Sequence, residues 1–150
     1  MKPEEWLHLE ALKEAGFDWG RRPTGGGVLF HTHDLAFSVL IPKGHPDLSD
    51  NTLENYRLIN SLVKRAVAPF VSSNTELLSL PQKEAPFCMA SPTIYDVMIG
   101  GKKVGGAAQR RTKRGLLHQG TLCLKKPPFK EWEPFFKEKS ILEQMEALSY

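Results

Sequence analysis

Apolar residues along this chain repeat with two different periods, and the changes between the periods mark the elements. Residues 3–14 carry apolar side chains three apart at Trp6, Leu9 and Leu12, a spacing typical of one face of an amphipathic helix. The segment begins with a proline, and Gly16 stands just beyond its end, which are helix start and stop signals. We therefore predict a short helix that packs on the core.

A strand-like stretch comes next. Residues 28–30 and 35–41 are mostly apolar and are separated by four polar residues. Pro42 follows, and a proline has no backbone N–H to give to a sheet. The pattern predicts a hairpin or a kinked strand that ends before Pro42.

A second helix is predicted after residue 51. Asn51 and Glu54 have the spacing of a capping box, in which the two side chains satisfy backbone N–H groups of the first turn. Pro69 marks the end of this helix. Apolar residues recur at helical spacing at Ile59, Leu62, Val63 and Ala66.

The clearest hairpin signal is Gly100-Gly101, which lies between strand-like residues 95–99 and 102–104. In the simplest register Lys102 lies opposite Ile99, and Lys103 lies opposite Met98. Neighbouring strand residues point to opposite faces, so Lys103 can face a pocket while Lys102 faces solvent.

The remaining segments complete an α+β pattern. Residues 70–87 predict loops around a short strand, residues 116–124 predict a further strand that carries His118, and a final helix is expected from about Trp132. We predict a mixed, largely antiparallel sheet covered by a few helices. The 150 residues are 41% hydrophobic and 25% charged, which fits one domain over residues 1–150 with one buried core.

Several function classes are disfavoured by composition. No apolar run approaches the roughly 20 residues that span a bilayer, and residues 1–6 lack the apolar core of a signal peptide, so we expect a cytoplasmic protein without a membrane partner. Cys88 and Cys123 form no CxxC pair, so neither a disulfide framework nor a structural zinc site is expected. His31, His33 and Asp34 lie close together in the sequence, but nothing in it fixes the further ligand that a metal site needs. We therefore predict no metal site.

The net charge of +3 is unevenly spread. Six basic residues fall together with no acidic residue among them. Such a stretch is either a solvated face or an anion attractor. No nucleic-acid-binding signature and no interleaved aromatic residues accompany it, so we expect no nucleic-acid partner. The residues are Lys102, Lys103, Arg110, Arg111, Lys113 and Arg114.

One segment joins fixed cations to bare backbone. Arg21 and Arg22 precede the run Gly25-Gly26-Gly27, and an apolar segment then leads to His31. Glycines let a ligand approach the backbone, and successive N–H groups can line an anion site. The alternative is a tight turn between helix and strand. The run lacks the Gly-Lys-Ser/Thr ending of a P-loop.

Three ordered blocks carry a resemblance to a known family. They are Arg21-Arg22-Pro23-Thr24-Gly25-Gly26-Gly27 with Phe30-His31; Tyr95-Asp96 with Gly101-Lys102-Lys103-Val104-Gly105-Gly106-Ala107-Ala108-Gln109-Arg110-Arg111; and His118-Gln119-Gly120-Thr121-Leu122. In this order they resemble the lipoate-protein ligase and octanoyltransferase family, whose fold biotin ligases share.

The resemblance implies an enzyme that attaches a lipoyl or octanoyl group to one lysine of a lipoyl domain. Ligases of the family use ATP and lipoate, with Mg²⁺ expected, and transferases use octanoyl-acyl carrier protein. The implied acceptors are the lipoyl domains of 2-oxoacid dehydrogenases or the glycine-cleavage H protein.

The resemblance also implies roles for residues. Lys103 matches the catalytic lysine of the family, and Cys88 stands where one transferase branch carries its nucleophilic cysteine. A thiolate attacks, and a neighbouring cation such as Lys103 would favour it. The alternative for Cys88 is a buried inert thiol. The implied donor-binding residues are Arg21, Arg22, Thr24, Gly25, Gly26, Gly27, His31, Gly105, Gly106, Ala107 and His118.

Family members usually have a helix and a strand ahead of the first block, whereas this chain has only a short helix before Arg21. The resemblance therefore suggests a domain shortened at its N-terminus. A catalytically silent member that binds the acyl donor or the lipoyl domain without turnover stays open as the alternative.

Overall fold

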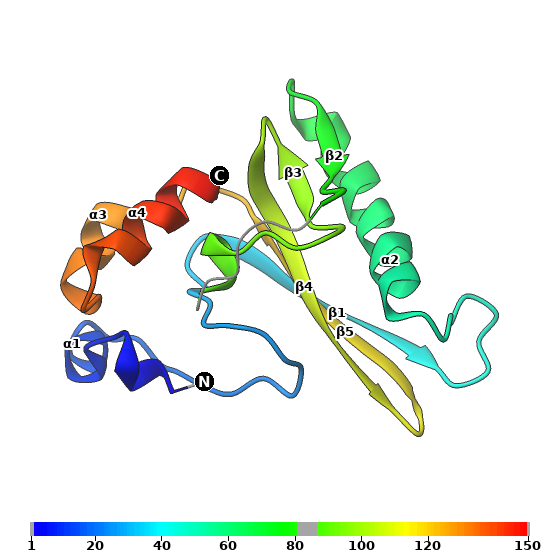
Figure 1. Cartoon of the computed structure of the whole chain (residues 1–150), viewed down its shortest axis with the longest axis horizontal. Helices are drawn as coiled ribbons and strands as arrows, with labels where there is room; N and C mark the ends of the chain where they lie inside the picture. The colour runs from blue at the N-terminus through cyan, green and yellow to red at the C-terminus, as the bar shows by residue number, and fades with distance from the viewer. Residues whose placement is uncertain (1, 81–86, 150) are drawn as a thin grey trace.

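The computed structural model describes residues 2–80 and 87–149, and within them a five-stranded antiparallel sheet forms the centre (Figure 1). The strands lie in the order β1-β5-β4-β3-β2. The predicted α+β class is confirmed. The strands are β1 (Asp34–Pro42), β2 (Thr75–Leu77), β3 (Val97–Ile99), β4 (Lys102–Thr112) and β5 (Gly115–Cys123).

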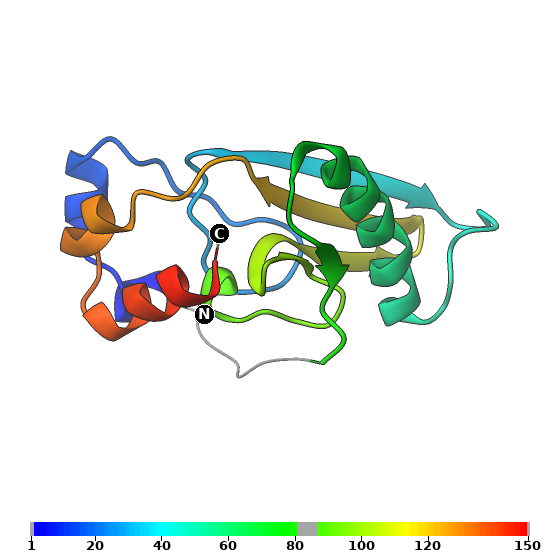
Figure 2. The ribbon, with the colours of Figure 1, turned by 90° about the horizontal axis from the view of Figure 1, so that it is seen from above.

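The helices form two groups on either side of the sheet (Figure 2). Helix α2 (Thr52–Val67) packs on one face, and its side chains meet those of β3 and β4 there. Helices α1, α3 and α4 gather together on the side of the sheet away from α2 (Figure 1). Their bounds are Leu9–Glu14, Phe129–Trp132 and Lys139–Leu148, and short 3-10 turns cover Pro3–Glu5, Ala68–Phe70, Cys88–Ala90 and Glu133–Phe135.

Helix α2 begins as predicted but presents a different face. The Asn51 side chain accepts a hydrogen bond from the Leu53 N–H at 2.9 Å, which confirms the N-cap. Ile59 is buried as predicted, whereas Leu62 is 55% exposed. In place of Leu62, the buried face of the helix carries Asn60, whose amide donates to a loop carbonyl. The loop beside the sheet needs a hydrogen-bond donor for its carbonyl. This need places a polar residue on the buried face of the helix, where the apolar pattern predicts an apolar one.

The β3–β4 hairpin has the predicted register. Ile99 lies opposite Lys102 and Met98 opposite Lys103, and a β-bulge then brings Val97 opposite Gly105. The two lysines therefore leave β4 on opposite faces. Lys102 is only half-exposed, because its Nζ donates to the carbonyl of Glu146 in α4 at 3.3 Å, so the expectation that it lies in solvent is wrong.

The predicted N-terminal helix is interrupted. A 3-10 turn ends at Glu5 and α1 starts at Leu9, because the backbone between them pairs with the C-terminal segment. The His8 N–H donates to the Phe135 carbonyl at 2.9 Å, and the Trp6 carbonyl accepts from the N–H two residues beyond Phe135 at 3.0 Å. Tertiary pairing has overridden the helical period here.

Two other predicted elements also differ. Residues 28–30 form no strand: only Val28 bridges Phe87, in parallel, and its carbonyl accepts from the Cys88 N–H at 3.2 Å. Strand β1 begins at Asp34 and includes Pro42, which lies at its end on an edge of the sheet, where a missing N–H is tolerated. The last long helix starts at Lys139 rather than near residue 132.

Buried apolar side chains gather in separate clusters among the described residues. The largest joins the helices at the left of Figure 1 to Phe30 and Phe87, which flank the glycine-rich segment and Cys88. A second lies between α2 and β3, around Val67 and Val97. In the described ranges, no helix is both long and apolar enough to cross a membrane.

Candidate functional site

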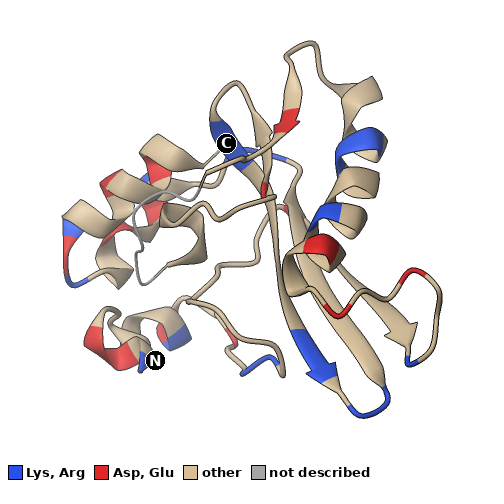
Figure 3. Ribbon diagram, turned by 45° about the vertical axis from the view of Figure 1, so that its right-hand side comes forward, with Lys and Arg blue, Asp and Glu red and all other residues tan. Residues whose placement is uncertain are grey.

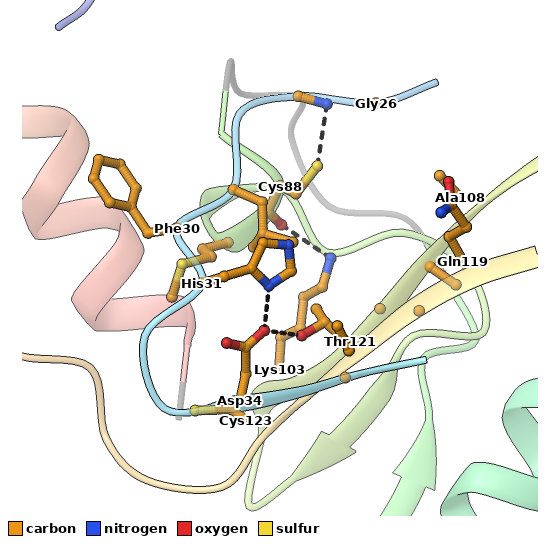
Figure 4. Close-up of a pocket in the computed structure, with 18 of the residues that line it drawn as sticks. Gly26, Phe30, His31, Asp34, Cys88, Lys103, Ala108, Gln119, Thr121 and Cys123 are labelled. Carbon is orange, nitrogen blue, oxygen red and sulfur yellow. Dashed lines mark hydrogen bonds and ion pairs between the residues drawn. The ribbon is translucent and has the colours of Figure 1, made fainter. Parts of the chain in front are cut away.

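A cavity of about 730 Å³ lies where the glycine-rich segment, the Cys88 turn and the sheet meet (Figure 4). We call residues 21–31 the donor loop. Arg21 is exposed on this loop and Thr24 is buried beneath it. Of the predicted site residues, the lining includes Arg22, Gly25, Gly26, Gly27, His31, Cys88, Lys103, Gly105, Gly106 and Ala107.

Lys103 is held as a cation on the cavity wall. Its Nζ lies 2.6 Å from Oδ2 of Asp96 and donates to the carbonyl oxygen of Cys88 at 2.9 Å. The Lys103 side chain is 12% exposed and that of Asp96 is 2% exposed. Oδ2 of Asp96 also accepts the N–H of Thr93 at 2.8 Å and its hydroxyl at 3.1 Å. The carboxylate is thereby fixed, and it fixes the ammonium group.

A turn behind Asp96 supports this arrangement. Tyr95 has φ of +69°, and it is the non-glycine residue with positive φ in the described ranges. Such a conformation costs of order 1 kcal/mol or more and persists only where the surroundings impose it. The Tyr95 carbonyl accepts from Nδ2 of the buried Asn60 at 2.9 Å, and its N–H donates to Leu78 at 2.8 Å. Helix α2 thus helps to place the carboxylate.

Gly106 leaves the space that Lys103 occupies. A Cβ at residue 106 would lie 2.6 Å from Cε and 2.9 Å from Nζ of Lys103, and 3.1 Å from Oδ1 of Asp96. Real Cβ atoms do not approach other atoms so closely. The absence of a side chain at Gly106 is therefore a geometric requirement of the Lys103 position.

The sulfur of Cys88 faces the donor loop. Its Sγ accepts the N–H of Gly27 at 3.1 Å and lies 3.5 Å from the Arg22 guanidinium. Lys103 bonds the carbonyl of Cys88 and not the sulfur, so the cation beside the sulfur is Arg22 rather than the expected Lys103. Gly26 has φ of +107°, and a Cβ there would collide with Arg22 and contact the sulfur.

The donor loop itself is tied to the sheet by single hydrogen bonds. The Thr24 hydroxyl donates to Oε1 of Gln119 in β5 at 2.9 Å. The Arg110 guanidinium in β4 donates to the Pro23 carbonyl at 3.2 Å. Between these anchors and Cys88, Gly25 has no atom within 4 Å of the position a Cβ would take. The loop is therefore open on the side where a ligand would meet its backbone.

His31 ends the loop beside a carboxylate. Its Nδ1 lies 2.6 Å from Oδ2 of Asp34, and the Thr121 hydroxyl donates to the same oxygen. The His31 side chain is 52% exposed, whereas that of Asp34 is 12% exposed. This pair anchors the end of the loop to the first residue of β1.

His118 lies behind the sheet rather than on the cavity lining. It is fully buried and its ring stacks on Phe37 at 6.1 Å between centroids. Nδ1 is paired with the amide of Gln109 at 2.9 Å, and Nε2 has no hydrogen-bond partner among the residues that the structure describes. Burial lowers the pKa of His118 to about 4, so the ring is neutral at physiological pH. Its donor-binding role stays a prediction.

The basic run divides between the two ends of β4 (Figure 3). Lys102 and Lys103 start the strand, and the other four residues lie at the β4–β5 hairpin end, where all are exposed. Of these four, Arg111 pairs with Asp50 at 3.2 Å and Arg110 anchors the donor loop. The run is therefore not one continuous surface.

Comparison with known proteins identifies the family. Residues 1–128 match the family described as the lipoyl protein ligase A/B catalytic domain. The chain belongs to this family. Octanoyltransferase LipM of Lysinibacillus sphaericus is 31% identical over 126 residues, which are 79% of this chain and 46% of that protein. LipM of Kyrpidia tusciae is 32% identical over 131 residues, which are 81% of this chain and 47% of that protein.

Solved structures show the same lipoyl ligase fold, as predicted. A Thermoplasma acidophilum protein assigned as a lipoate protein ligase, with bound lipoic acid, superimposes with a TM-score of 0.69 at 25% identity over 96% of this chain and 54% of that chain. A lipoate-protein ligase A bound with ATP superimposes with a TM-score of 0.72 at 23% identity, over 96% and 55%. The chain spans about half the length of the curated relatives it matches.

In this lipoyl protein ligase A/B domain, Gln119 is a cavity residue that sequence reasoning did not single out. The same holds for Asp34, which also lines the cavity, and for Asp96, whose carboxylate fixes the ammonium group. Gln119 lies next to His118 in β5, lines the cavity and holds Thr24 of the donor loop. Strand alternation was the available signal: if Gly106 faces the cavity, its partner Thr121 and therefore Gln119 share that face, and His118 does not.

Proposed function

We propose that this domain transfers an octanoyl or lipoyl group to the acceptor lysine of a lipoyl domain. The observation that carries the proposal is the placement of the Cys88 sulfur and the Lys103 ammonium group on one cavity wall, under a glycine-rich loop, in a member of the lipoyl protein ligase A/B family. The LipM relatives favour octanoyl-acyl carrier protein as donor and Cys88 as nucleophile.

The first half-reaction loads the sulfur. The Cys88 thiolate attacks the thioester carbonyl of octanoyl-acyl carrier protein, a new C–S bond forms, and the bond from the carbonyl carbon to the carrier sulfur breaks. The carrier leaves as a thiolate, which takes a proton from water. Cys88 suits this role because its Sγ lies in the cavity, where it accepts the Gly27 N–H at 3.1 Å and lies 3.5 Å from the Arg22 guanidinium. A thiol surrounded only by apolar side chains would lack such donors.

The second half-reaction releases the product. The acceptor lysine nitrogen attacks the Cys88 thioester, a C–N bond forms, the C–S bond breaks, and the amide leaves with one proton given up by the nitrogen. A negative charge develops on the carbonyl oxygen in both steps. Lys103 and the N–H groups of Gly25 and Gly26 are the cavity-wall donors that we assign to that charge.

An ATP-dependent ligase is the second candidate, because the same wall presents cations to a phosphate-bearing donor. Arg22 and Lys103 line the cavity together, and a lipoate-protein ligase A with bound ATP shares the fold. In that case ATP and lipoate, with Mg²⁺, form an acyl-adenylate and Cys88 is not acylated. In either case we propose a cytoplasmic reaction whose acceptors are lipoyl domains of 2-oxoacid dehydrogenases or the glycine-cleavage H protein.

Two parallel reactions test the proposal. The purified chain is incubated with an apo-lipoyl domain and either octanoyl-acyl carrier protein or ATP, Mg²⁺ and lipoate, and intact mass spectrometry follows both proteins. We expect acylated domain with the carrier donor and an acylated enzyme intermediate. If the domain is modified only in the reaction with ATP, the proposal of a Cys88 thioester is wrong. If it is modified with neither donor, the alternative of a catalytically silent binding member is favoured.

Paired variants identify the groups. Cys88→Ser should abolish carrier-dependent transfer, whereas Cys123→Ser should retain it. Lys103→Ala should lower kcat/KM by roughly 10²-fold or more, since it removes a charge at the developing oxyanion, while Lys102→Ala on the opposite face should stay near wild type. Equal losses for both lysines would contradict the assignment.

A further inference from the structure

We propose that His31 accepts the proton released when the amide bond forms, and that Asp34 is the residue that orients it. The inference rests on the proposed function and adds a proton acceptor to it. Amide formation with a lysine must discharge a proton from the attacking nitrogen, so a base is required within reach of the acyl group.

The geometry of the pair sets the tautomer. Nδ1 of His31 lies 2.6 Å from the Asp34 carboxylate, which has no proton to donate, so Nδ1 carries the hydrogen and Nε2 carries the free lone pair. The hydroxyl of Thr121 donates to the same carboxylate oxygen and holds it from β5. Figure 4 shows the second ring nitrogen directed away from Asp34. An imidazole held in this way is built to accept a proton at Nε2.

The two cations of the wall are unsuited to this task. Arg22 stays protonated at any physiological pH. The Lys103 ammonium lies 2.6 Å from the buried Asp96 carboxylate, which stabilises its charged form. Cys88 is occupied by the acyl group when the amide forms. These groups face the cavity from the donor loop, β4 and the Cys88 turn.

The remaining titratable groups of the cavity are equally unsuited. Tyr56 faces it from α2 and Cys123 from β5, and burial raises the pKa of both, so neither is a base at neutral pH. Lys125, just beyond β5, is an exposed lysine and hence a cation. Asp34 already accepts two hydrogen bonds, from His31 and Thr121. His33 also lines the cavity, but among the described residues no carboxylate pairs with its ring. His31 is thus the titratable group of the cavity whose imidazole a carboxylate orients.

The exposure of His31 completes the proton route. The acceptor nitrogen bonds to the acyl carbon, the electron pair of the C–S bond returns to the Cys88 sulfur, and the proton passes from nitrogen to Nε2. Because the His31 side chain is 52% exposed, the imidazolium can return the proton to water before the next turnover. Asp34 stabilises the imidazolium while it exists.

A single-turnover experiment isolates this step. The enzyme is first loaded at Cys88 with octanoyl-acyl carrier protein, and the loaded enzyme is mixed with apo-lipoyl domain between about pH 5.5 and 8.5, across the ordinary range of histidine titration. We expect His31→Gln to slow transfer by roughly 10²-fold near neutral pH. The ratio of the wild-type rate to the variant rate should rise with pH, because only a neutral imidazole can accept a proton. The acceptor lysine titrates equally for both enzymes and cancels.

Matched variants separate chemistry from folding. Normal loading of Cys88 in His31→Gln shows that the variant is folded. Asp34→Asn should also slow transfer but less, because an amide supports either tautomer. His45→Gln, an exposed histidine that pairs with Asp47 outside this cavity, should transfer at the wild-type rate. A flat rate ratio, or an equal loss in His45→Gln, overturns the inference. Failure of the wild-type chain to load or transfer with any donor instead defeats the proposed function.

Discussion

The two sides of the cavity are built in opposite ways. On the β4 side, strand register, a buried ion pair and the strained Tyr95 turn hold Lys103, whose ammonium group bonds to both Asp96 and the Cys88 carbonyl. On the donor-loop side, residues 21–31 have no regular structure beyond one bridge. Single hydrogen bonds to Gln119 and Arg110 join this loop to the sheet, and its other polar contacts go to Cys88 and Asp34.

The difference indicates that the β4 side holds a charged group in place, whereas the donor-loop side lets a ligand enter the cavity. A charge that must meet a developing oxyanion is most effective when it is already in place, because no reorganisation is then needed during the reaction. A loop held to the sheet by few hydrogen bonds opens at low cost, and such opening suits the entry of the acyl chain of the proposed donor. Four substitutions test this division, and the largest effects are expected on the β4 side.

Removal of Asp96 should be the most damaging change. Asp96→Ala leaves the Lys103 ammonium on a largely buried wall without its carboxylate, so we expect the free energy of unfolding to fall by about 3–5 kcal/mol. Urea denaturation measures it. Glu133→Ala, which breaks the exposed pair with Lys139, should leave stability within the error of measurement. A similar loss of stability in both variants would show that the Asp96–Lys103 pair contributes no more than an exposed ion pair.

Gly106→Ala should come next, and it should affect activity more than stability. The added Cβ displaces the flexible end of Lys103, which can move without unfolding the sheet. We expect kcat/KM for acyl transfer to fall by roughly 10²-fold, which is the scale of a lost oxyanion contact. Gly20→Ala, where no atom lies within 4 Å, is the control. Wild-type activity of Gly106→Ala would mean that Lys103 need not occupy the observed position.

Acid should weaken the face behind the sheet through His118. Its folded-state pKa of about 4 lies below the ordinary value near 6.5, so the unfolded chain binds more protons between these values. Stability is therefore complete above about pH 6.5 and falls as the pH drops toward 4. His118→Gln should remove this loss, which a shift of that size makes about 3 kcal/mol at pH 4. Denaturation of both proteins at several pH values gives the comparison, and parallel curves would refute the assignment.

The smallest effect is expected on the donor loop. Thr24→Val removes the hydroxyl bond to Gln119 at nearly constant volume, and we expect a stability loss of about 1 kcal/mol or less. The KM for the acyl donor should rise several-fold while kcat changes little, because the loop is loosened but the β4 side is intact. Thr52→Val at the exposed start of α2 serves as the control. A fall in kcat as large as that of Gly106→Ala would end the division between the two sides.

Local patterns were sufficient for much of the fold. The Gly100-Gly101 turn fixed the β3–β4 register, and Asn51 marked the start of α2, because both signals act within a few residues. Residues 3–14 and 28–30 were predicted less well. Their backbones pair with Phe135 and Cys88, more than 50 residues away, and such pairing leaves no periodic signal.

The site shows the same division. The glycine-rich loop, Lys103 and Cys88 could be located from short motifs and a family resemblance. The partners of the Cys88 sulfur could not be located in this way. Arg22 rather than Lys103 lies beside the sulfur because the donor loop passes the side-chain side of the Cys88 turn, whereas Lys103 meets its backbone carbonyl. His118 was selected over Gln119 since a histidine carries more recognisable chemistry, although strand alternation would have directed Gln119 to the cavity.

The bond from Lys103 to the Cys88 carbonyl couples the two residues to which the proposed reaction assigns chemistry. The 3-10 turn of Cys88 supplies the sulfur through its side chain and an anchor for the ammonium group through its backbone. A substitution that shifts this turn moves both groups at once. Kinetic costs measured at Cys88 and at Lys103 will therefore not add in a double-mutant cycle, and the two residues behave energetically as one unit.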